Sequence, residues 1–307
     1  MNLSGNQGIV PSSNTPWVFS VFQLILAFFI VLENGIVLIA VIKYLRRLTP
    51  ACLLIINLTV ADIVMGLVLP VQVASRLSVS FAENDSVCSA RISTMVLASF
   101  SSLFAVLLTA VDRYLGVCRC ISYYKTVTIK RTTGAIVCMW IYAVVVAFYP
   151  FRFYNQDIQT TPDCVMKQHV SHVYVGFMPF QYFSILIIMC YIYCHICRTA
   201  LNRRRTISVD QGFVLSSRVL RLERELRAAR LMALILIVFV FCWTPFAVTQ
   251  IYDITESEVN PTVVKFTDTS AFLGILNSVV NPFIYPLQNR DFKKAFTQVF
   301  LCRTKLC

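Results

Sequence analysis

Seven long apolar blocks are the feature of this 307-residue chain that most restricts how it can fold. They lie at 17–42, 51–75, 89–115, 133–150, 171–197, 229–252 and 266–287, with mostly short polar connections between them. A helix needs about 20 apolar residues to cross the roughly 30 Å hydrocarbon core of a bilayer. A buried soluble helix could resemble one such block, but not all seven. The sequence therefore predicts an all-α membrane protein, a seven-transmembrane helix bundle.

The composition agrees with this fold class. Hydrophobic residues make up 57% of the chain and charged residues 14%, and the mean hydropathy is +0.70. A soluble domain is about half apolar and about a quarter charged, and a disordered chain has low hydrophobicity. The first block is too long for a cleaved signal peptide and lacks a preceding positive segment. We expect an N-terminal arm at 1–16, the membrane domain at 17–287, and a tail at 288–307 that includes a short amphipathic eighth helix.

The basic residues alternate between the connections and predict the topology. When alternate segments are combined, 22 of the 27 Lys and Arg residues fall on one side. Cytoplasmic loops carry the excess of such residues, and residues 1–16 contain none. We therefore expect a multi-pass plasma-membrane protein with its N-terminus extracellular and its C-terminus cytoplasmic. The net charge of +12 then reflects topology and anionic membrane lipid rather than binding to nucleic acid.

Several side chains outside the apolar blocks are candidates for modification. Cys88 and Cys164 both lie on the predicted outer, oxidising side, where a disulfide is expected. Asn2 and Asn84 begin Asn-X-Ser sequons on the same side and are predicted glycosylation sites. Cys302 follows a short amphipathic stretch on the cytoplasmic side, where palmitoylation is predicted. For the last residue, Cys307, the sequence does not distinguish a palmitoylated from a free thiol.

Few ionisable side chains lie inside the apolar blocks, and lipid cannot solvate those that do, so they are candidates for function. Among them are the carboxylates Glu33 and Asp62, and candidates of the same kind in the first and seventh blocks are Asn34, Asn277, Ser278 and Asn281. A carboxylate surrounded by Asn and Ser can bind a hard cation or water. It can equally belong to a hydrogen-bond network between helices that holds no ion, and the residues alone do not separate these two interpretations.

The third block ends with the acid–base run Asp112–Tyr114, and Glu225 opens the sixth block on the same side. Glu225 could reach Arg113 if the third and sixth helices meet. Pro245 and Pro282 interrupt the sixth and seventh blocks. Proline removes a helical hydrogen bond and produces a kink, so both helices are expected to bend.

Together these features resemble the rhodopsin-like (class A) G-protein-coupled receptors over essentially the whole chain. The resemblance rests on motifs in the family's order: Asn34, Leu58–Asp62, Asp112–Tyr114, Trp140, Cys242–Pro245 and Asn281–Tyr285, followed by Phe292 of an eighth helix. Leu32–Asn34 and the absence of a fifth-helix proline at Ile185 are typical of the branch of lipid, cannabinoid, melanocortin and adenosine receptors. The runs Cys88–Arg91 and Leu107–Leu115 are most similar to lipid-amide receptors of the glucose-dependent insulinotropic type.

The resemblance implies roles for individual residues. In coupling and activation, the implied residues are Asp112, Arg113, Tyr114, Ile121, Tyr193, Glu225 and Tyr285. A switch beneath the ligand is implied for Phe239, Trp243, Pro245, Asn281 and Pro282, and an allosteric sodium site for Asp62, Ser102, Asn277, Ser278 and Asn281. Beyond this sodium ion, no metal or cofactor is expected.

The ligand is expected to contact Arg91, Met95, Ser99, Trp243 and Phe246. Met95 stands where amine receptors carry Asp, which argues against a biogenic amine. The aromatic and apolar outer halves of the helices favour a small hydrophobic, lipid-like ligand, although such residues are also ordinary membrane packing. Arg91 could bind a head group through its fork of donors, reach the lipid head groups, or anchor a loop.

The expected function is therefore a receptor that activates a heterotrimeric G protein. The stimulatory class, which raises cyclic AMP, is the favoured one. Arrestin is expected as a further partner. Other possibilities within the fold are a receptor for a nucleoside or small peptide, or a constitutively active receptor. A transporter is a remote alternative, because no internal repeats are present. An enzyme is not expected, because His169, His172 and His195 lie in loops or at helix ends and show neither metal-ligand spacing nor a nucleophile–base pairing.

Overall fold

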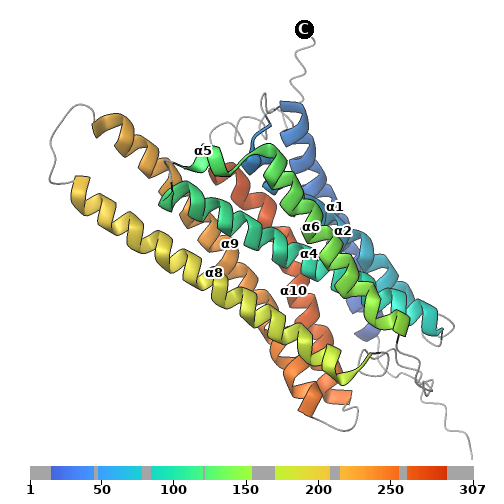
Figure 1. Ribbon diagram of the computed structural model, residues 1–307. Coiled ribbons are helices and arrows are strands. Elements are labelled where there is room, and N and C mark those ends of the chain that lie inside the picture. The colour runs from blue at the N-terminus through green and yellow to red at the C-terminus, as the bar shows by residue number, and fades with distance from the viewer. Residues whose placement is uncertain are drawn as a thin grey trace, which may run out of the picture.

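The computed structural model describes residues 15–44, 48–77, 84–119, 122–153, 170–207, 215–255 and 261–288, and these ranges contain helices and no strand. The helices are α1 (Thr15–Tyr44), α2 (Pro50–Leu77), α4 (Asp85–Cys118), α5 (Tyr123–Thr126), α6 (Ile129–Phe153), α8 (His172–Ile207), α9 (Leu215–Thr255) and α10 (Pro261–Gln288). Figure 1 shows the seven long helices side by side as a bundle, with the four-residue α5 at one end. The predicted eighth helix falls in 288–307, essentially outside the described residues.

Each predicted span lies within one long helix, with the start of the fifth (171) one residue ahead of α8, but the helices run past the apolar blocks. The largest differences are in α8, which continues to Ile207, and in α9, which already begins at Leu215. Both project beyond α4 and α6 at one end of the bundle (Figure 1). Their extensions are rich in Arg, Leu and Glu, which are good helix formers. Hydropathy therefore predicted the part of each helix that lipid requires, and not the part that extends into water.

Six of the helices are long and apolar enough to cross a membrane, among the residues that the structure describes. The seventh predicted span lies in α10, which is not one of the six. The described side chains of α10 end at Phe283, so they do not include the whole predicted span. Its polar residues Ser270, Asn277, Ser278 and Asn281 are all buried and face protein.

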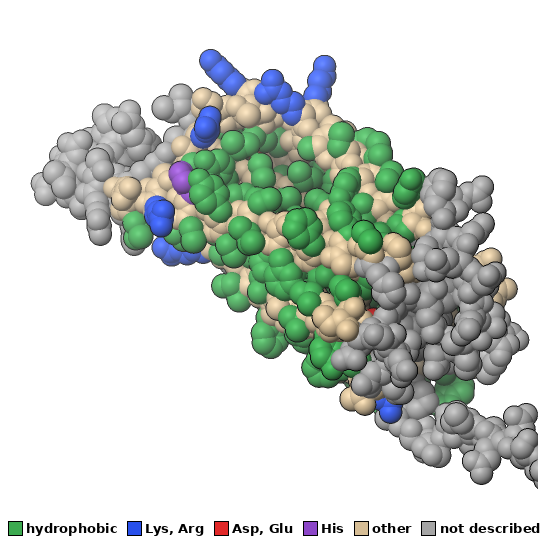
Figure 2. Space-filling model, turned by 60° about the horizontal axis from the view of Figure 1, so that its bottom comes forward, with side chains coloured by type: hydrophobic (Ala, Val, Ile, Leu, Met, Phe, Trp, Pro, Cys, Tyr) green, Lys and Arg blue, Asp and Glu red, His purple; other side chains and the backbone are tan. Residues whose placement is uncertain are grey.

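The outside of the bundle is apolar. On α1 alone, Trp17, Phe28 and Ile42 are 60%, 63% and 68% exposed. Figure 2 shows hydrophobic side chains over most of the visible face, with Lys and Arg gathered mainly toward one end. Such a large apolar surface is unfavourable in water, and it fits a hydrocarbon environment.

Two backbone carbonyls that lose their helical donor to a proline accept hydrogen bonds from side chains of other helices. Pro282 cannot donate to the Ser278 carbonyl one turn earlier, and Asn34 of α1 donates its Nδ2 to that oxygen at 3.2 Å. Likewise, Pro150 leaves the Val146 carbonyl free, and the Tyr174 hydroxyl of α8 donates to it at 2.7 Å. A buried carbonyl without a partner is costly. Each proline therefore creates an acceptor that fastens one helix to another.

Candidate functional site

An apolar cavity of about 110 Å³ lies among α4, α8, α9 and α10. Its lining residues are Met95, Val96, Ser99, Phe100, Leu103, Met178, Pro179, Tyr182, Phe239, Trp243, Phe246, Ala247, Gln250 and Ala271. The lining includes four of the five predicted ligand residues, and none of its members is charged. Ligand pockets usually measure about 300–1,000 Å³, so a ligand here must be slender or must displace side chains.

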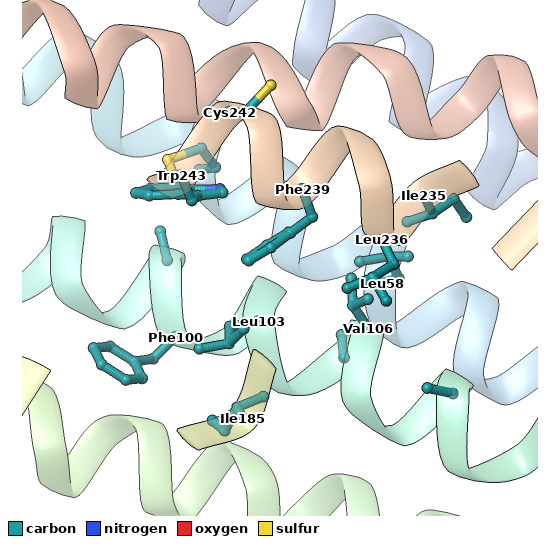
Figure 3. Packing of buried hydrophobic residues seen from close by; sticks show 14 of the residues in the cluster. Leu58, Phe100, Leu103, Val106, Ile185, Ile235, Leu236, Phe239, Cys242 and Trp243 are labelled. Atoms are coloured by element: carbon teal, nitrogen blue, oxygen red, sulfur yellow. The ribbon is translucent and has the colours of Figure 1, made fainter. Parts of the chain in front are cut away.

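Stacked aromatic rings form one wall of the cavity. The Trp243 and Phe239 rings stack at a centroid distance of 6.1 Å, and Phe239 stacks on Tyr182 of α8 at 6.3 Å. The Tyr182 hydroxyl is hydrogen-bonded to Oγ1 of Thr244 at 2.9 Å. In Figure 3, Phe239 points from α9 toward Leu103 of α4. A ligand in the cavity would therefore touch both predicted switch residues.

Gln250 is a polar lining residue that the sequence reasoning did not single out. It is 6% exposed and lines the cavity, and its carboxamide makes no hydrogen bond in the described part of the chain. A buried amide without a partner is costly, so Gln250 is suited to a ligand that offers a donor or an acceptor. Helical spacing could have found it, because it lies two turns after Trp243 on the same side of α9.

Arg91, the fifth predicted ligand residue, does not line this cavity. Its guanidinium donates to Oγ of Ser75 on α2 at 3.3 Å, and its carbonyl accepts from Nε2 of Gln72 at 2.9 Å. These contacts agree with an anchoring role between α2 and α4. A ligand role for Arg91 stays a prediction that would require a ligand extending beyond the cavity.

Asp62 lies in the buried middle of the bundle. Its carboxyl oxygens accept from Oγ of Ser278 at 2.8 Å and from Nδ2 of Asn281 at 2.9 Å, and no part of Asp62 is exposed. Ser102 and Asn277 are also buried, and their side-chain polar atoms have no hydrogen-bond partner among the described residues. Two of the predicted sodium ligands thus contact Asp62 directly, and the other two have free polar atoms.

We name the two ends of the bundle after Arg113 and Arg91. At the Arg113 end, the Arg113 guanidinium pairs with the Asp112 carboxylate through Oδ2. The other Asp112 oxygen accepts from the Tyr123 hydroxyl of α5 at 2.8 Å. Tyr123 was not predicted, because nothing in the local sequence indicates that the connection folds back onto α4. Asp112 therefore joins α4, Arg113 and the short helix α5.

The remaining predicted activation residues are only partly covered by the structure. Tyr114 packs edge-on against His195 of α8 at 5.3 Å, and Tyr193 is buried. Glu225 and Tyr285 lie on α9 and α10, but their side chains fall outside the described part, as does all of Ile121. The contact between Arg113 and Glu225 therefore stays a prediction.

The predicted modification sites lie mostly outside the described residues. Cys88 is buried and disulfide-bonded, whereas its predicted partner Cys164 lies outside the described ranges, as do Asn2, Cys302 and Cys307. Asn84 is exposed and caps α4, with its Oδ1 accepting from the backbone N–H groups of Ser86 and Val87. A glycan would be attached through Nδ2, which leaves that cap intact.

Comparison with known proteins gives the family. The profile of the 7 transmembrane receptor (rhodopsin family) matches residues 33–285. The chain is 29% identical to Adenosine receptor A2b of Bos taurus, over 94% of this chain and 92% of that protein. It is 29% identical to Histamine H2 receptor of Cavia porcellus, over 92% and 79%, and 26% identical to Cannabinoid receptor 1 of Xenopus laevis, over 92% and 63%. With its bundle of apolar helices, the chain is a multi-pass membrane receptor and not an enzyme. It belongs to the rhodopsin family of seven-transmembrane (class A G-protein-coupled) receptors.

Proposed function

We propose that this receptor binds a small, uncharged, largely apolar ligand in the cavity above Trp243 and activates a heterotrimeric G protein at the Arg113 end. The Arg91 end is then extracellular and the Arg113 end cytoplasmic, in the plasma membrane. The observation that carries the proposal is the cavity itself, because its uncharged lining ends on the stacked rings of Trp243 and Phe239. Ligand contact there can bias α9, which contains Pro245 within the helix.

The lining supports this ligand class over a charged one. Burial of an isolated charge is very costly unless it is paired, and no acidic or basic side chain lines the cavity. One relative is named for histamine, which is a cationic amine. Such a ligand would find no acidic side chain to pair with in this cavity, where Met95 stands at the position at which amine receptors carry Asp. The apolar walls instead suit a lipid-like body, and Gln250 suits one neutral donor or acceptor, such as an amide.

A nucleoside is the second candidate. The Gln250 carboxamide offers both a donor and an acceptor to a base edge, and a relative with 29% identity is named for adenosine. The small volume of the cavity and its apolar walls favour the lipid-like ligand over the nucleoside.

Asp112 and Arg113 support the proposed coupling. At rest, Asp112 holds Arg113, and activation releases the guanidinium toward the G protein. We assign the stimulatory class on Ile121, whose apolar side chain suits an apolar cleft on the G protein, and arrestin as a further partner of the same end. The basic side chains that flank it suit anionic membrane lipid.

A sodium ion is proposed as an allosteric ligand at Asp62. Hard cations prefer oxygen ligands, and the buried, unpartnered Oγ of Ser102 and Oδ1 of Asn277 fit this need. Asp62 itself supplies the charge, and Ser278 and Asn281 orient it. The ion would stabilise the resting arrangement of α2, α4 and α10.

A ligand panel tests the proposed function. Cells that express the chain would be exposed to lipid amides, nucleosides and short peptides, with cyclic AMP and calcium as readouts. We expect a cyclic AMP rise with an uncharged lipid amide. A response confined to amines or acids would contradict the proposed ligand class, and a calcium response alone would contradict stimulatory coupling.

Replacing Gln250 with leucine is expected to raise the EC50 for an amide-bearing agonist about tenfold, because one hydrogen bond in a dry cavity is lost. Gln250→Asn, which keeps the amide, serves as the conservative control. The cyclic AMP dose–response curve for an agonist without a polar group should be unchanged. Equal shifts for both agonists would mean that Gln250 only fills space.

Replacing Tyr123 with phenylalanine is expected to raise ligand-free G-protein activation about fivefold. The change removes the hydroxyl that donates to Asp112, and a loss of about 1 kcal/mol from a two-state equilibrium has this effect. Tyr124→Phe is the matched control, because Tyr124 is 72% exposed. The measurement is basal GTPγS binding, and equal rates in both variants would argue against the Tyr123 contact.

A further inference from the structure

We propose that Gly274 of α10 is a positioning residue for Trp243: the absence of a side chain there lets the indole occupy its resting place against α10. The inference rests on the proposed function, in which movement of Trp243 couples the cavity to the Arg113 end. The inference adds Gly274, on the neighbouring helix α10, as a residue that determines how firmly the indole is held in the resting state.

The distance between Gly274 and the indole carries the inference. A Cβ atom at Gly274 would lie 2.9 Å from both Cδ2 and Cε3 of Trp243 and 3.0 Å from Cε2. Carbon atoms in favourable contact are about 3.5–4.0 Å apart. The three atoms belong to one rigid, fused ring, so the clash cannot be relieved at the end of a flexible chain. Only a rotation of the whole indole, or a shift of α9 away from α10, would make room.

The indole has little space in which to move while the bundle stays at rest. Trp243 is 6% exposed, Phe239 stacks on it, and Phe246 meets it edge-on at 6.0 Å. Its Nε1 is buried and has no hydrogen-bond partner in the described ranges. Packing rather than hydrogen bonding therefore holds the ring, and a single methyl group can change its position.

Other glycines of the described helices provide matched controls. Gly35 and Gly134 have nothing within 4 Å of an added Cβ. At Gly66 an added Cβ would lie 2.8 Å from Cγ2 of Val31, at the contact of α1 with α2. The Gly66 clash involves the side chains of Val31 and Ile30 and the Ala27 carbonyl oxygen, none of which lines the cavity. Gly66→Ala thus reports the cost of a general packing defect. Gly35→Ala and Gly134→Ala report the effect of alanine itself.

Alanine at Gly274 should oppose the resting position of the indole. Overpacking a well-filled site forces side chains off their preferred rotamers, and here it penalises the state in which Trp243 lies against α10. The population therefore shifts toward the state in which the ring has moved. We expect ligand-free nucleotide exchange to rise about fivefold, the change that about 1 kcal/mol produces in a two-state equilibrium.

The position of the ring and its consequence can be measured separately. The receptor, with 5-fluorotryptophan at its three Trp residues, would be placed in lipid nanodiscs, and the Trp243 signal in the ¹⁹F NMR spectrum would be assigned with Trp243→Phe. Gly274→Ala should move this signal and leave those of Trp17 and Trp140 in place. Basal GTPγS binding by purified stimulatory G protein should rise in the same variant, and neither readout should change in Gly35→Ala or Gly134→Ala.

An unmoved Trp243 signal would overturn the proposal, and so would a moved signal without increased exchange, or a similar increase in Gly66→Ala. Failure of the proposed function has a different signature. In that case the wild-type receptor would respond to no ligand of the panel, whereas the proposed packing contact would still appear in the NMR spectrum.

A double-mutant cycle keeps the inference testable if Gly274→Ala folds poorly. The phenyl ring of Trp243→Phe is smaller than the indole and relieves the clash. Gly274→Ala should therefore lower the melting temperature, or the yield of folded receptor, much less in the Trp243→Phe background than in the wild type. Equal losses in both backgrounds would overturn the proposal.

Discussion

Replacing Arg113 with alanine is expected to reduce agonist-stimulated G-protein activation by at least about 100-fold. The guanidinium pairs with Asp112 in the structure, and in the proposed mechanism it exchanges this partner for the G protein on activation. Charge-assisted hydrogen bonds to one such group are worth about 3 kcal/mol, or roughly 100-fold. Receptor-catalysed GTPγS binding is the direct measurement.

The control for Arg113 is Arg119→Ala, which removes an exposed arginine from the same end of α4. Surface expression of both variants should match that of the wild type, because the proposed role of Arg113 is in coupling to the G protein. Signalling that persists in Arg113→Ala at normal expression would reject the coupling role of this residue. Loss of signalling in both variants would point instead to a general need for positive charge.

Exchanging Asp62 for asparagine is expected to abolish stabilisation of the receptor by sodium. The wild type should melt roughly 5 °C higher in saturating NaCl than in choline chloride of equal ionic strength, because an ion that binds only the folded state stabilises it by mass action. The Asp62→Asn change keeps the size of the side chain but removes the charge that a cation needs. Thermal unfolding of the purified receptor in the two salts gives the answer.

Glu33→Gln provides a matched change. Glu33 is another carboxylate within the apolar blocks, and it does not contact the Asp62 cluster through any hydrogen bond found in the described part. It should retain the sodium effect. If the wild type melts at the same temperature in both salts, Asp62 serves a hydrogen-bond network between α2 and α10 without an ion. The sequence left these two interpretations open, and this comparison separates them.

The parts of the site that lie on regular helices could be predicted from the sequence. Met95, Ser99, Trp243 and Phe246 do line one cavity, because helical spacing and family motifs fix which side of each helix they occupy. In the same way, Ser278 and Asn281 contact Asp62 across the bundle. These predictions depend on the order of the helices, which the family resemblance supplied.

Residues whose importance depends on a partner distant in sequence could not be predicted. Tyr123 becomes relevant only when its connection folds back onto Asp112. Gly274 carries no side chain whose chemistry would attract attention, and its role depends on where one indole ring lies. The contact of the Arg91 guanidinium with Ser75 likewise depends on the packing of α2 beside α4, and a ligand role for Arg91 stays a prediction.

The hydrogen bond from Asn34 to the Ser278 carbonyl also bears on how the protein is made. The two residues are 244 positions apart, so the first helix to leave the ribosome cannot complete its contacts until the last helix has been synthesised. During that interval the Asn34 amide can donate only within its own helix, to the Ile30 carbonyl at 3.0 Å. A chain truncated before Ser278 would lack this contact, so the first and last helices of the membrane domain depend on each other for their final packing.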